Sequence, residues 1–524
     1  MLNNNSTAGS ANQHDISFFG FRGNATLSNV TVTSGNGTTA NSNSYGIVFT
    51  NASGFAPLGT VSLSNVTVQG HVGKGALTFQ FYSDVSGVSL NNVSLKDSVA
   101  PWSQMIVHHN SSNALALGTT SLKTMALWLN GGVDATNASF FNAAGTALDK
   151  TVTADALQIE NQIAHAIDVA GLGLARVRAG HVYVTSSSFA APTTTAPSIQ
   201  RGVNAASAGD TVVIGAGTYA GYVALNKGVT LDGAGRSDTN PAQLTKLTPP
   251  TPWGTSSPLP AQVLVSADNA SIKNLQVEGI IDGGLSVTRG VSVDSDAAGN
   301  ASVDGLTLDN VLVSLCQYGF SVVNGEVASN VTLTGSKFAS NGNGFSVEGS
   351  GALSNVTVTS CEFPNNVYGF SSNADAPLAV AGPAVVNANS AGLTGVTVTN
   401  SSFNGNSLKG LYFEKLNDAT FTGITVDGSG VDASNAFTNG MDINLKFGAY
   451  SNISIIDSEI VNSGVRGTQT NALFPTALAI KARDDAGHPT YGPKPASLSG
   501  VLVKNTYVGG PENAMRIGEP GKNN

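Results

Sequence analysis

Ser28-Asn29-Val30-Thr31-Val32 is the first copy of a phrase that recurs through most of this chain. Close copies occupy residues 64–68, 329–333 and 354–358, and looser relatives occupy residues 395–398, 423–426, 451–455 and 500–503. A short β-branched strand that returns behind a turn signal is the sequence signature of a solenoid, in which each repeat stacks on the next.

The repeats have a recognisable period. The residues that lead them are β-branched, and we treat as equivalent Val311, Val331, Val356, Val396, Ile424, Ile453 and Val501. Once the insertions at residues 374–389, 466–475 and 484–496 are set aside, the spacing corresponds to a unit of about 25 residues, within the range of stacked supersecondary units.

A second motif opens successive units. Gly319-Phe320-Ser321-Val322 returns at residues 344–347 and 369–371, and each copy precedes a polar turn, a strand and a closing Asn. Strands this short alternate inward apolar and outward polar residues. Asn and Gly tolerate the left-handed backbone angles of tight corners. Three short strands per turn with such corners predict an all-β fold, the right-handed parallel β-helix.

The composition agrees with a long solenoid. The chain has 524 residues, of which 61 are Gly and only 11% are charged, and its formal net charge is −9. No cluster of Lys and Arg indicates nucleic-acid binding, and no apolar run is long enough to predict a membrane span. The first residues lack the basic and apolar regions of a signal peptide. The polar, weakly charged surface is nevertheless typical of an extracellular or cell-surface protein, whose export route the sequence does not show.

The two cysteines give a test of the register. Cys316 and Cys361 each follow a repeat-leading valine, Val311 and Val356, by the same interval. Because strands stack at about 4.8 Å, this register predicts that the sulfurs lie two coils apart, at roughly 10 Å, beyond the reach of a disulfide. We expect both cysteines to be buried, unreactive hydrophobes.

The repeats fall into two stacks. Residues 1–150 read as a β-helix segment without an N-terminal cap, and residues 198–524 read as a second β-helix. Between them, residues 151–197 combine a helix, a strand and a Ser/Thr/Pro linker. Ile159, Ile163 and Ile167 have helical spacing, so an amphipathic helix over residues 154–170 is expected to cap the first stack.

The second stack has a characteristic start. Ile199, Val203 and Ala206 form a short helical face, and a turn at residues 208–210 leads into the Val-rich residues 211–214. Residues 198–235 resemble the N-terminal entry of the pectin-lyase-like superfamily of secreted parallel β-helix proteins, and the similarity continues more diffusely to residue 524. The resemblance implies the fold strongly and the function hardly at all, because function resides in sites grafted on folds.

The scarce charges concentrate on one face near the C-terminus. When the opening strands of the last coils are aligned by their inward residues, one outward column contains Tyr412, Asp442 and Arg516. The next column contains Glu414, Asn444 and Lys481, and Arg483 lies one step further. In a chain this poor in charge, the best candidate catalytic residues are therefore Tyr412, Glu414, Asp442, Lys481 and Arg483.

These five residues fit three interpretations. A polysaccharide lyase would use Lys481 or Tyr412 as a base and Arg483 to neutralise a uronate carboxylate. A glycoside hydrolase would use the two carboxyl groups of Glu414 and Asp442. The third interpretation is structural, because acidic and basic side chains in register on adjacent coils form a cross-strand charge ladder.

The loop that follows Arg483 offers a second carboxylate pair for a hydrolase, Asp484 and Asp485, together with His488. It does not complete a polygalacturonase-like signature. In that family the equivalent residues lie on separate coils, whereas here they share one loop.

One oxygen-rich turn could hold a cation. Asp294, Asp296, Asn300 and Asp304 offer the hard oxygen ligands that Ca²⁺ prefers. Their spacing matches no standard calcium loop, so a solvated corner is the alternative. We expect no required cofactor, with Ca²⁺ as the one candidate ion.

On balance, the sequence favours an extracellular structural or adhesive solenoid that associates head to tail with copies of itself into a filament or surface layer. The reasons are the low charge, the Asn and Thr ladders, the lack of caps and the absence of a complete catalytic motif. The alternative is a polysaccharide lyase or glycoside hydrolase that binds an extracellular polysaccharide with the face formed by residues 412–485.

Overall fold

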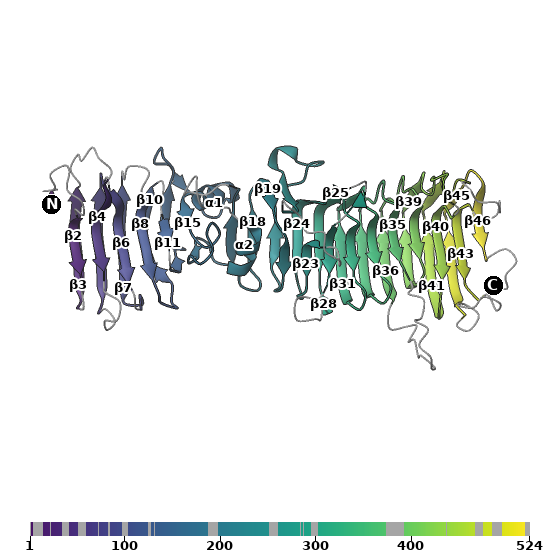
Figure 1. Cartoon of the computed structure of the whole chain (residues 1–524), viewed down its shortest axis with the longest axis horizontal. Helices are drawn as coiled ribbons and strands as arrows, with labels where there is room; N and C mark the ends of the chain where they lie inside the picture. Colours follow the sequence, from purple (N-terminus) through teal and green to yellow (C-terminus); the bar gives the residue numbers. More distant parts are fainter. Residues whose placement is uncertain are drawn as a thin grey trace. The chain divides into compact units, whose positions relative to one another are not determined.

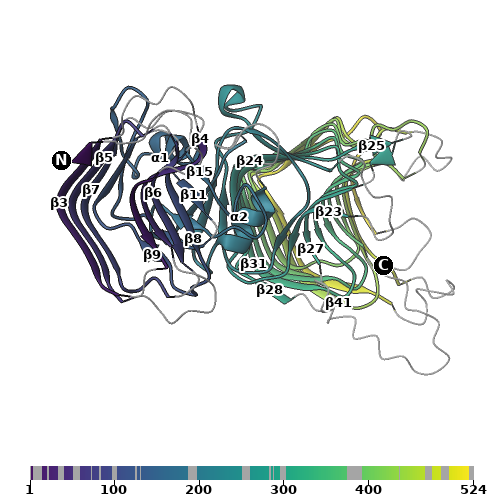
Figure 2. The ribbon, with the colours of Figure 1, turned by 60° about the vertical axis from the view of Figure 1, so that its left-hand side comes forward.

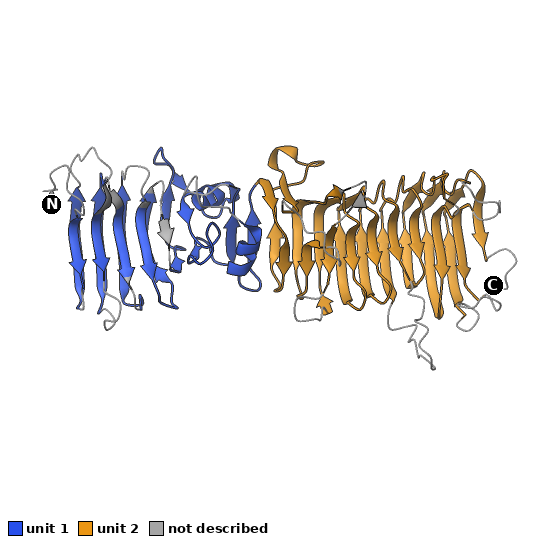
Figure 3. Ribbon diagram, viewed as in Figure 1, with its two compact units in different colours: residues 1–215 blue, residues 216–524 orange. Residues whose placement is uncertain are grey.

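The computed structural model describes the whole chain except residues 1, 4–13, 21–22, 34–40, 51–58, 72, 82–83, 97–102, 124–126, 130, 187–197, 251–259, 283–284, 287, 295–301, 374–391, 436, 467–474, 485–494 and 519–524. The chain divides into two compact units, residues 1–215 and residues 216–524 (Figure 3). Each unit is a stack of short, mainly parallel strands (Figure 1).

Among the described residues of the first unit, neighbouring strands of each sheet come from successive coils. The seven-stranded sheet runs in the order β1 (Leu2–Asn3), β3 (Ala25–Thr33), β5 (Val61–Gln69), β7 (Val88–Lys96), β10 (Thr120–Lys123), β13 (Ser139–Phe141) and β14 (Ala147–Leu148). The six-stranded sheet contains β2 (His14–Phe19), β4 (Asn41–Thr50), β6 (Gly73–Phe81), β8 (Ser103–His109), β11 (Leu127–Leu129) and β15 (Ile163–Ala164). The three-stranded sheet contains β9 (Leu115–Ala116), β12 (Val133–Asp134) and β16 (Ala175–Arg176), and β17 (His181–Val184) pairs in parallel with β18 (Thr211–Ile214).

The described part of the first unit also contains two short helices, and one of them differs from the expectation. Helix α1 (Thr153–Glu160) stops at Glu160 instead of continuing to residue 170. Ile163 instead lies in β15 and pairs with Leu127 of β11. The predicted helix was too long because strand pairing overrides the local helical spacing of the isoleucines. Ile159 of α1 still contributes to the core of the first stack.

Helix α2 (Ile199–Ala205) begins where the sequence places it. The side chain of Ser198 caps its start by accepting a hydrogen bond from the N–H of Arg201 (3.4 Å), and Ile199 and Val203 are buried. No helix in the described part of the chain is long and apolar enough to span a membrane.

The second unit repeats the plan over more coils, with the strands of each sheet lying one behind another (Figure 2). Its longest ladder runs through β21 (Thr230–Asp232), β24 (Ser271–Glu278), β29 (Thr307–Ser314), β31 (Val327–Thr334), β34 (Ala352–Thr359), β36 (Leu393–Thr399), β38 (Asn417–Thr422), β41 (Ala449–Ile456) and β44 (Ser497–Lys504). Beside it lie β19 (Gly217–Ala220), β22 (Thr245–Thr248), β28 (Ser302–Asp304) and β32 (Lys337–Ala339).

A ten-stranded sheet forms another face of the second unit. It contains β20 (Val223–Leu225), β23 (Ala261–Val265), β27 (Arg289–Val293), β30 (Tyr318–Val322), β33 (Asn343–Val347), β35 (Tyr368–Ser372), β37 (Lys409–Phe413), β40 (Asn439–Leu445), β43 (Thr476–Ala482) and β46 (Asn513–Ile517). The remaining elements are the sheet of β39 (Thr425–Asp427), β42 (Glu459–Val461) and β45 (Tyr507–Gly509), the hairpin β25 (Ile281–Asp282)/β26 (Leu285–Ser286), and one 3-10 turn, η1 (Pro241–Gln243).

These ladders confirm the expected all-β, parallel β-helix fold. In the second unit every pairing between successive coils of the ten-stranded sheet is parallel. The repeat length is also confirmed, because Val331 pairs with Val356 and side-chain hydrogen bonds join residues 25 apart, as from the N–H of Cys316 to Asn341 Oδ1.

Two of the repeat-leading residues were assigned to the wrong column. Thr332 pairs with Thr307, so the equivalent of Val331 in the preceding coil is Leu306 and not Val311. Similarly, Val396 pairs with Ala419 and not with Ile424. Each coil carries inward apolar residues on both sides of a corner, and the two sets look alike in the sequence.

The corners behave as the composition predicts. Asn330 and Asn355 both have a φ of 54°, in the left-handed region that Asn tolerates. The amide of Asn355 donates to Asn330 Oδ1 (3.3 Å), and the amide of Asn330 donates to Asp304 Oδ1 (2.6 Å). A second ladder in the first unit joins Asn29, Asn65 and Asn92 in the same way. Amide ladders therefore tie the coils together at their corners.

Stacked aromatic rings fill the interior of the second unit. Phe363 lies between Phe338 and Phe403, with ring centroids 5.2 and 4.8 Å away and nearly parallel planes. All three rings are fully buried, and burying one such side chain is worth about 1.5–3 kcal/mol.

Both cysteines are buried, and neither forms a disulfide, as expected. Burial raises the pKa of the Cys316 thiol to about 12 and that of Cys361 to about 11, so neither is a reactive thiolate at neutral pH. The expected register was wrong. Cys361 lies in the same column as Ser336, because the N–H of the next residue, Glu362, donates to Ser336 O and the N–H of Cys361 donates to Ser401 Oγ. Cys316 lies in the column of the next corner, where its N–H donates to Asn341 Oδ1. The two cysteines therefore occupy different columns.

Candidate functional site

The candidate site lies on the outward face of the ten-stranded sheet, on its last coils. Tyr412 of β37 pairs with Asp442 of β40, which pairs with Ala479 of β43, which in turn pairs with Arg516 of β46. Asn444 pairs with Lys481 in the neighbouring outward column. The strand register therefore reproduces the two polar columns that the sequence alignment places there.

Asp442 is the centre of the first charge cluster. Its side chain is 2% exposed, and its Oδ2 accepts a hydrogen bond from Lys409 Nζ at 2.7 Å. Lys481 Nζ lies 3.7 Å from Oδ1, an ion pair that is too long for a hydrogen bond. Burial by itself would raise the pKa of Asp442, but the charges of Lys409 and Lys481 outweigh it and lower this pKa to about 2. Asp442 is therefore an anion at every physiological pH.

Tyr412 is the centre of the second cluster. Its hydroxyl donates to Glu414 Oε1, which also accepts from Lys446 Nζ, and the amide of Asn444 donates to the Tyr412 oxygen at 3.4 Å. Burial, together with the negative charges of Glu414 and Asp442, holds the pKa of Tyr412 well above its usual value. Tyr412 therefore keeps its proton at neutral pH, as a proton donor requires.

The two clusters open into one pocket of about 470 Å³, a volume within the range of ligand sites. Five of the lining side chains are cationic: Lys409, Lys446, Lys481, Arg483 and Arg516. The others are Tyr368, Leu408, Tyr412, Asn435, Phe437, Asn439, Asp442 and Asn444. The chain as a whole has 24 Lys and Arg residues and a net charge of −9. The pocket therefore gathers cationic side chains although the chain as a whole is negatively charged.

The pocket also offers hydrogen-bond acceptors. Asp442 Oδ1 and Asn444 Oδ1 are both buried, and neither accepts a hydrogen bond from any described residue. A buried acceptor without a donor costs free energy. Donors on a ligand, such as hydroxyl groups, would satisfy both atoms, while the cations would bind a negative group on the same ligand.

The structure brings together all five sequence-predicted site residues. Tyr412, Asp442, Lys481 and Arg483 line the pocket, and Glu414 contacts it through Tyr412 and Lys446. Glu348 lies in the Glu414 column two coils earlier, because Val347 pairs with Ser372 and Ser372 pairs with Phe413. Its Oε2 accepts a hydrogen bond from Nη2 of buried Arg289 at 3.1 Å. Of the loop that follows Arg483, Asp485 and His488 lie outside the described residues.

Sequence reasoning missed Lys409, the partner that holds Asp442 most closely. Lys409 begins β37, and its column contains Tyr368 and Asn439 of the neighbouring coils. Strict alternation from the inward Leu411 would place Lys409, two residues earlier in the strand, on the inward face, so the strand pattern carries no signal that Lys409 lies outward in the pocket. A single charged residue at a strand start gives no such signal by itself.

The expected calcium turn is only partly described. Asp296 and Asn300 lie outside the described residues. Asp304 accepts from Ser329 Oγ and from the Asn330 amide, each at 2.6 Å, and these hydrogen bonds lower its pKa. Asp304 is thus the start of an amide ladder, and Ca²⁺ binding at Asp294, Asp296 and Asp304 stays a prediction.

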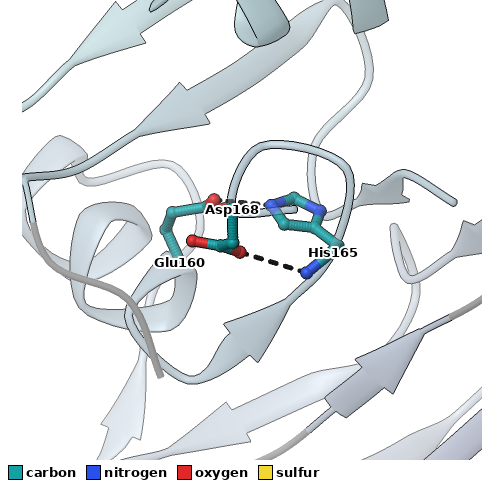
Figure 4. Close-up of side chains that lie close together, drawn as sticks. All are labelled: Glu160, His165 and Asp168. Atoms are coloured by element: carbon teal, nitrogen blue, oxygen red, sulfur yellow. Dashed lines mark hydrogen bonds and ion pairs between the residues drawn. The ribbon is translucent and has the colours of Figure 1, made fainter. Parts of the chain in front are cut away.

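A different group could hold a metal ion. Glu160, His165 and Asp168 are buried in the first unit, with ligand atoms within 4.8 Å of one another (Figure 4). His165 Nε2 lies 2.6 Å from Glu160 Oε1, and His165 Nδ1 accepts the N–H of Ala175 at 3.1 Å. Because Nδ1 acts as an acceptor, a neutral ring carries its proton on Nε2, where it bonds Glu160. This arrangement fits a structural hydrogen bond better than a metal ligand.

No protein-family model and no curated protein matches the sequence. Among solved structures, the chain is similar to the A-module of the mannuronan C-5 epimerase AlgE4 of Azotobacter vinelandii, with 14% identity over 58% of this chain and 88% of that chain and a TM-score of 0.35. It is also similar to the pectate lyase Pel9A, with 13% identity over 62% and 78% of the two chains and a TM-score of 0.27. The gp42 tailspike of Acinetobacter phage vb_AbaP_AS12 shares 9% identity over 76% and 73%, with a TM-score of 0.32. The parallel β-helix that the sequence resemblance implies is confirmed by the strand ladders of this chain.

Proposed function

We propose that this chain binds an acidic polysaccharide on the ten-stranded sheet and cleaves it beside a uronate residue by β-elimination, as a polysaccharide lyase. The observation that carries the proposal is the pocket itself, where five cations surround a protonated tyrosine and two buried acceptor oxygens. Cations suit the carboxylate of a uronate, and the acceptors suit its hydroxyl groups. The proposal includes an extracellular site of action.

The residues divide naturally into roles. Arg483 and Arg516 would neutralise the uronate carboxylate, which makes the proton on the adjacent carbon, C5, easier to remove. Lys481, the lysine less tightly held by Asp442, would act as the general base and take that proton after it has released its own. As the C5–H bond breaks, its electron pair forms a C4–C5 double bond, the bond from C4 to the leaving oxygen breaks, and that oxygen receives a proton from the Tyr412 hydroxyl.

The same geometry argues against a glycoside hydrolase. A hydrolase needs one protonated carboxyl group as the general acid. Asp442 has a pKa of about 2 and is ionised at neutral pH. Glu414 accepts hydrogen bonds from both Tyr412 and Lys446, which is the role of a carboxylate anion. Neither group is therefore arranged as a proton donor.

A panel of uronic-acid polymers tests the proposal. Cleavage by β-elimination creates unsaturated chain ends that absorb ultraviolet light, whereas hydrolysis creates reducing ends without that absorbance. We expect Lys481→Ala and Tyr412→Phe each to lower kcat/KM by at least about 100-fold, the usual contribution of a general base or acid. Lys273→Ala, which removes a half-exposed lysine paired with Asp232 far along the stack, is the matched control. Full activity in Lys481→Ala, or reducing ends without ultraviolet absorbance, would contradict the lyase assignment.

The structural alternative, head-to-tail association into filaments or a surface layer, stays a prediction. Electron microscopy and sedimentation velocity of the purified chain distinguish it from the lyase proposal, because a lyase requires no polymer. Filaments that form in the absence of polysaccharide would support the structural alternative.

A further inference from the structure

An exposed aromatic ring stands at the edge of the cationic pocket. Phe437 precedes β40 and lines the pocket together with Lys409 and Asp442. Its side chain is 63% exposed. Removing a phenylalanine ring from water is favourable, and in the folded chain most of this ring remains in contact with water.

The loop that carries the ring is held in place by its own hydrogen bonds. Asp432 Oδ1 accepts from the N–H and the hydroxyl of Ser434, at 2.9 and 2.6 Å. Asn435 Oδ1 accepts the N–H of Phe437 at 3.0 Å, and the Thr438 hydroxyl donates to Val465 O at 2.5 Å. The described residues around the ring are therefore tied down by hydrogen bonds, at a site that already gathers polar groups.

We propose that Phe437 forms a sugar-stacking subsite, in which its ring packs against the C–H face of the pyranose next to the uronate held by the cations. This inference rests on the proposed function and adds a second subsite to it. An aromatic face buries the apolar C–H side of a sugar ring while the sugar hydroxyls stay in contact with water or polar partners. Phenylalanine has no hydrogen-bonding group, so this subsite recognises the ring face and not its charge.

The subsite predicts a dependence on chain length. A single uronate fills only the cationic pocket, whereas a longer oligosaccharide also reaches Phe437. The free energy of stacking should therefore appear as tighter binding of oligomers than of the monosaccharide. It should be similar for oligomers of different uronates, because the ring contacts the sugar ring and not its carboxylate.

Calorimetric titration with galacturonate, with galacturonate oligomers of increasing length and with the corresponding mannuronate oligomers tests this inference on the full chain. We expect Phe437→Ala to weaken oligomer binding by about tenfold, from the loss of roughly 1.4 kcal/mol of burial, and to leave monosaccharide binding unchanged. Phe437→Trp, which keeps an aromatic face, should retain the oligomer affinity. Phe19→Ala removes a ring of similar exposure, 69%, in the first unit and is the matched control.

The outcomes separate the two proposals. A wild-type chain that binds none of these sugars overturns both. A wild-type chain that binds oligomers as tightly as the Phe437→Ala variant overturns the stacking subsite alone. A change in sedimentation coefficient on Phe437→Ala would show that the ring contacts another copy of the chain, and would also overturn it. Because the ring is exposed, the variant should keep the wild-type thermal unfolding temperature.

Discussion

At the scale of single residues, Asp442 couples the candidate site to stability. Its pKa is about 2 in the folded chain, because the lowering by Lys409 and Lys481 exceeds the raising by burial, and about 3.9 in an unfolded chain. A carboxyl group with a depressed folded pKa stabilises the fold fully above its unfolded pKa. That stabilisation is lost as the pH falls from about 4 to about 2, and it amounts to about 2 kcal/mol.

The prediction is a pH-dependent difference between the wild type and Asp442→Asn. At pH 7 the variant should be less stable by about 3–5 kcal/mol, because Lys409 and Lys481 lose their buried partner. Towards pH 2 the difference should narrow by about 2 kcal/mol as the wild-type carboxylate takes up its proton. Urea denaturation followed by circular dichroism at several pH values measures both effects. A difference that stays constant from pH 7 to pH 2 would show that Asp442 is not held as an anion.

At the scale of elements, the corner ladders make a separable contribution. Asn330 combines two roles, a left-handed backbone with φ of 54° and amide hydrogen bonds to Asp304 and from Asn355. Asn330→Ala should cost about 2 kcal/mol, since it removes exposed hydrogen bonds and strains the backbone. Asn330→Gly removes the same bonds without the strain and should be about 1 kcal/mol more stable than the Ala variant. Gly395, which occupies the same column with φ of 65°, already shows that glycine fits there. Equal stability of the two variants in denaturant would contradict the strain argument.

The strands and helices also show which features of the fold could be predicted from the sequence. The Asn corners, the inward phenylalanines and the outward columns of Tyr412 and Glu414 could be predicted, because side chains alternate strictly along a strand and equivalent residues stack coil on coil. The register of Val311 and Ile424 could not be predicted, because each coil has inward apolar residues on both sides of a corner and the two sets look alike in the sequence. The role of Lys409 could not be predicted either, because its pairing with Asp442 depends on side-chain reach from one coil to the next and not on a motif. The length of α1 failed because Ile163 serves strand pairing.

At the scale of the whole molecule, the two compact units should respond separately to damage in their cores. In a stacked repeat protein each coil contacts its neighbours, so a core substitution weakens the coils around it more than distant ones. Phe363 and Phe79 are both fully buried aromatic residues, one in each unit. Replacing either by Ala should cost about 3–5 kcal/mol within its own unit.

Hydrogen exchange of the full chain, read by mass spectrometry, measures this separation. Phe363→Ala should accelerate exchange in β31, β34 and β36 of the second unit and leave β5 and β7 of the first unit unchanged. Phe79→Ala should do the reverse, with faster exchange in β4, β6 and β8. Exchange that accelerates equally in both units for either variant would show one cooperative structure instead. Because the candidate site lies wholly in the second unit, separate responses also predict that Phe79→Ala leaves the proposed polysaccharide binding intact while Phe363→Ala weakens it.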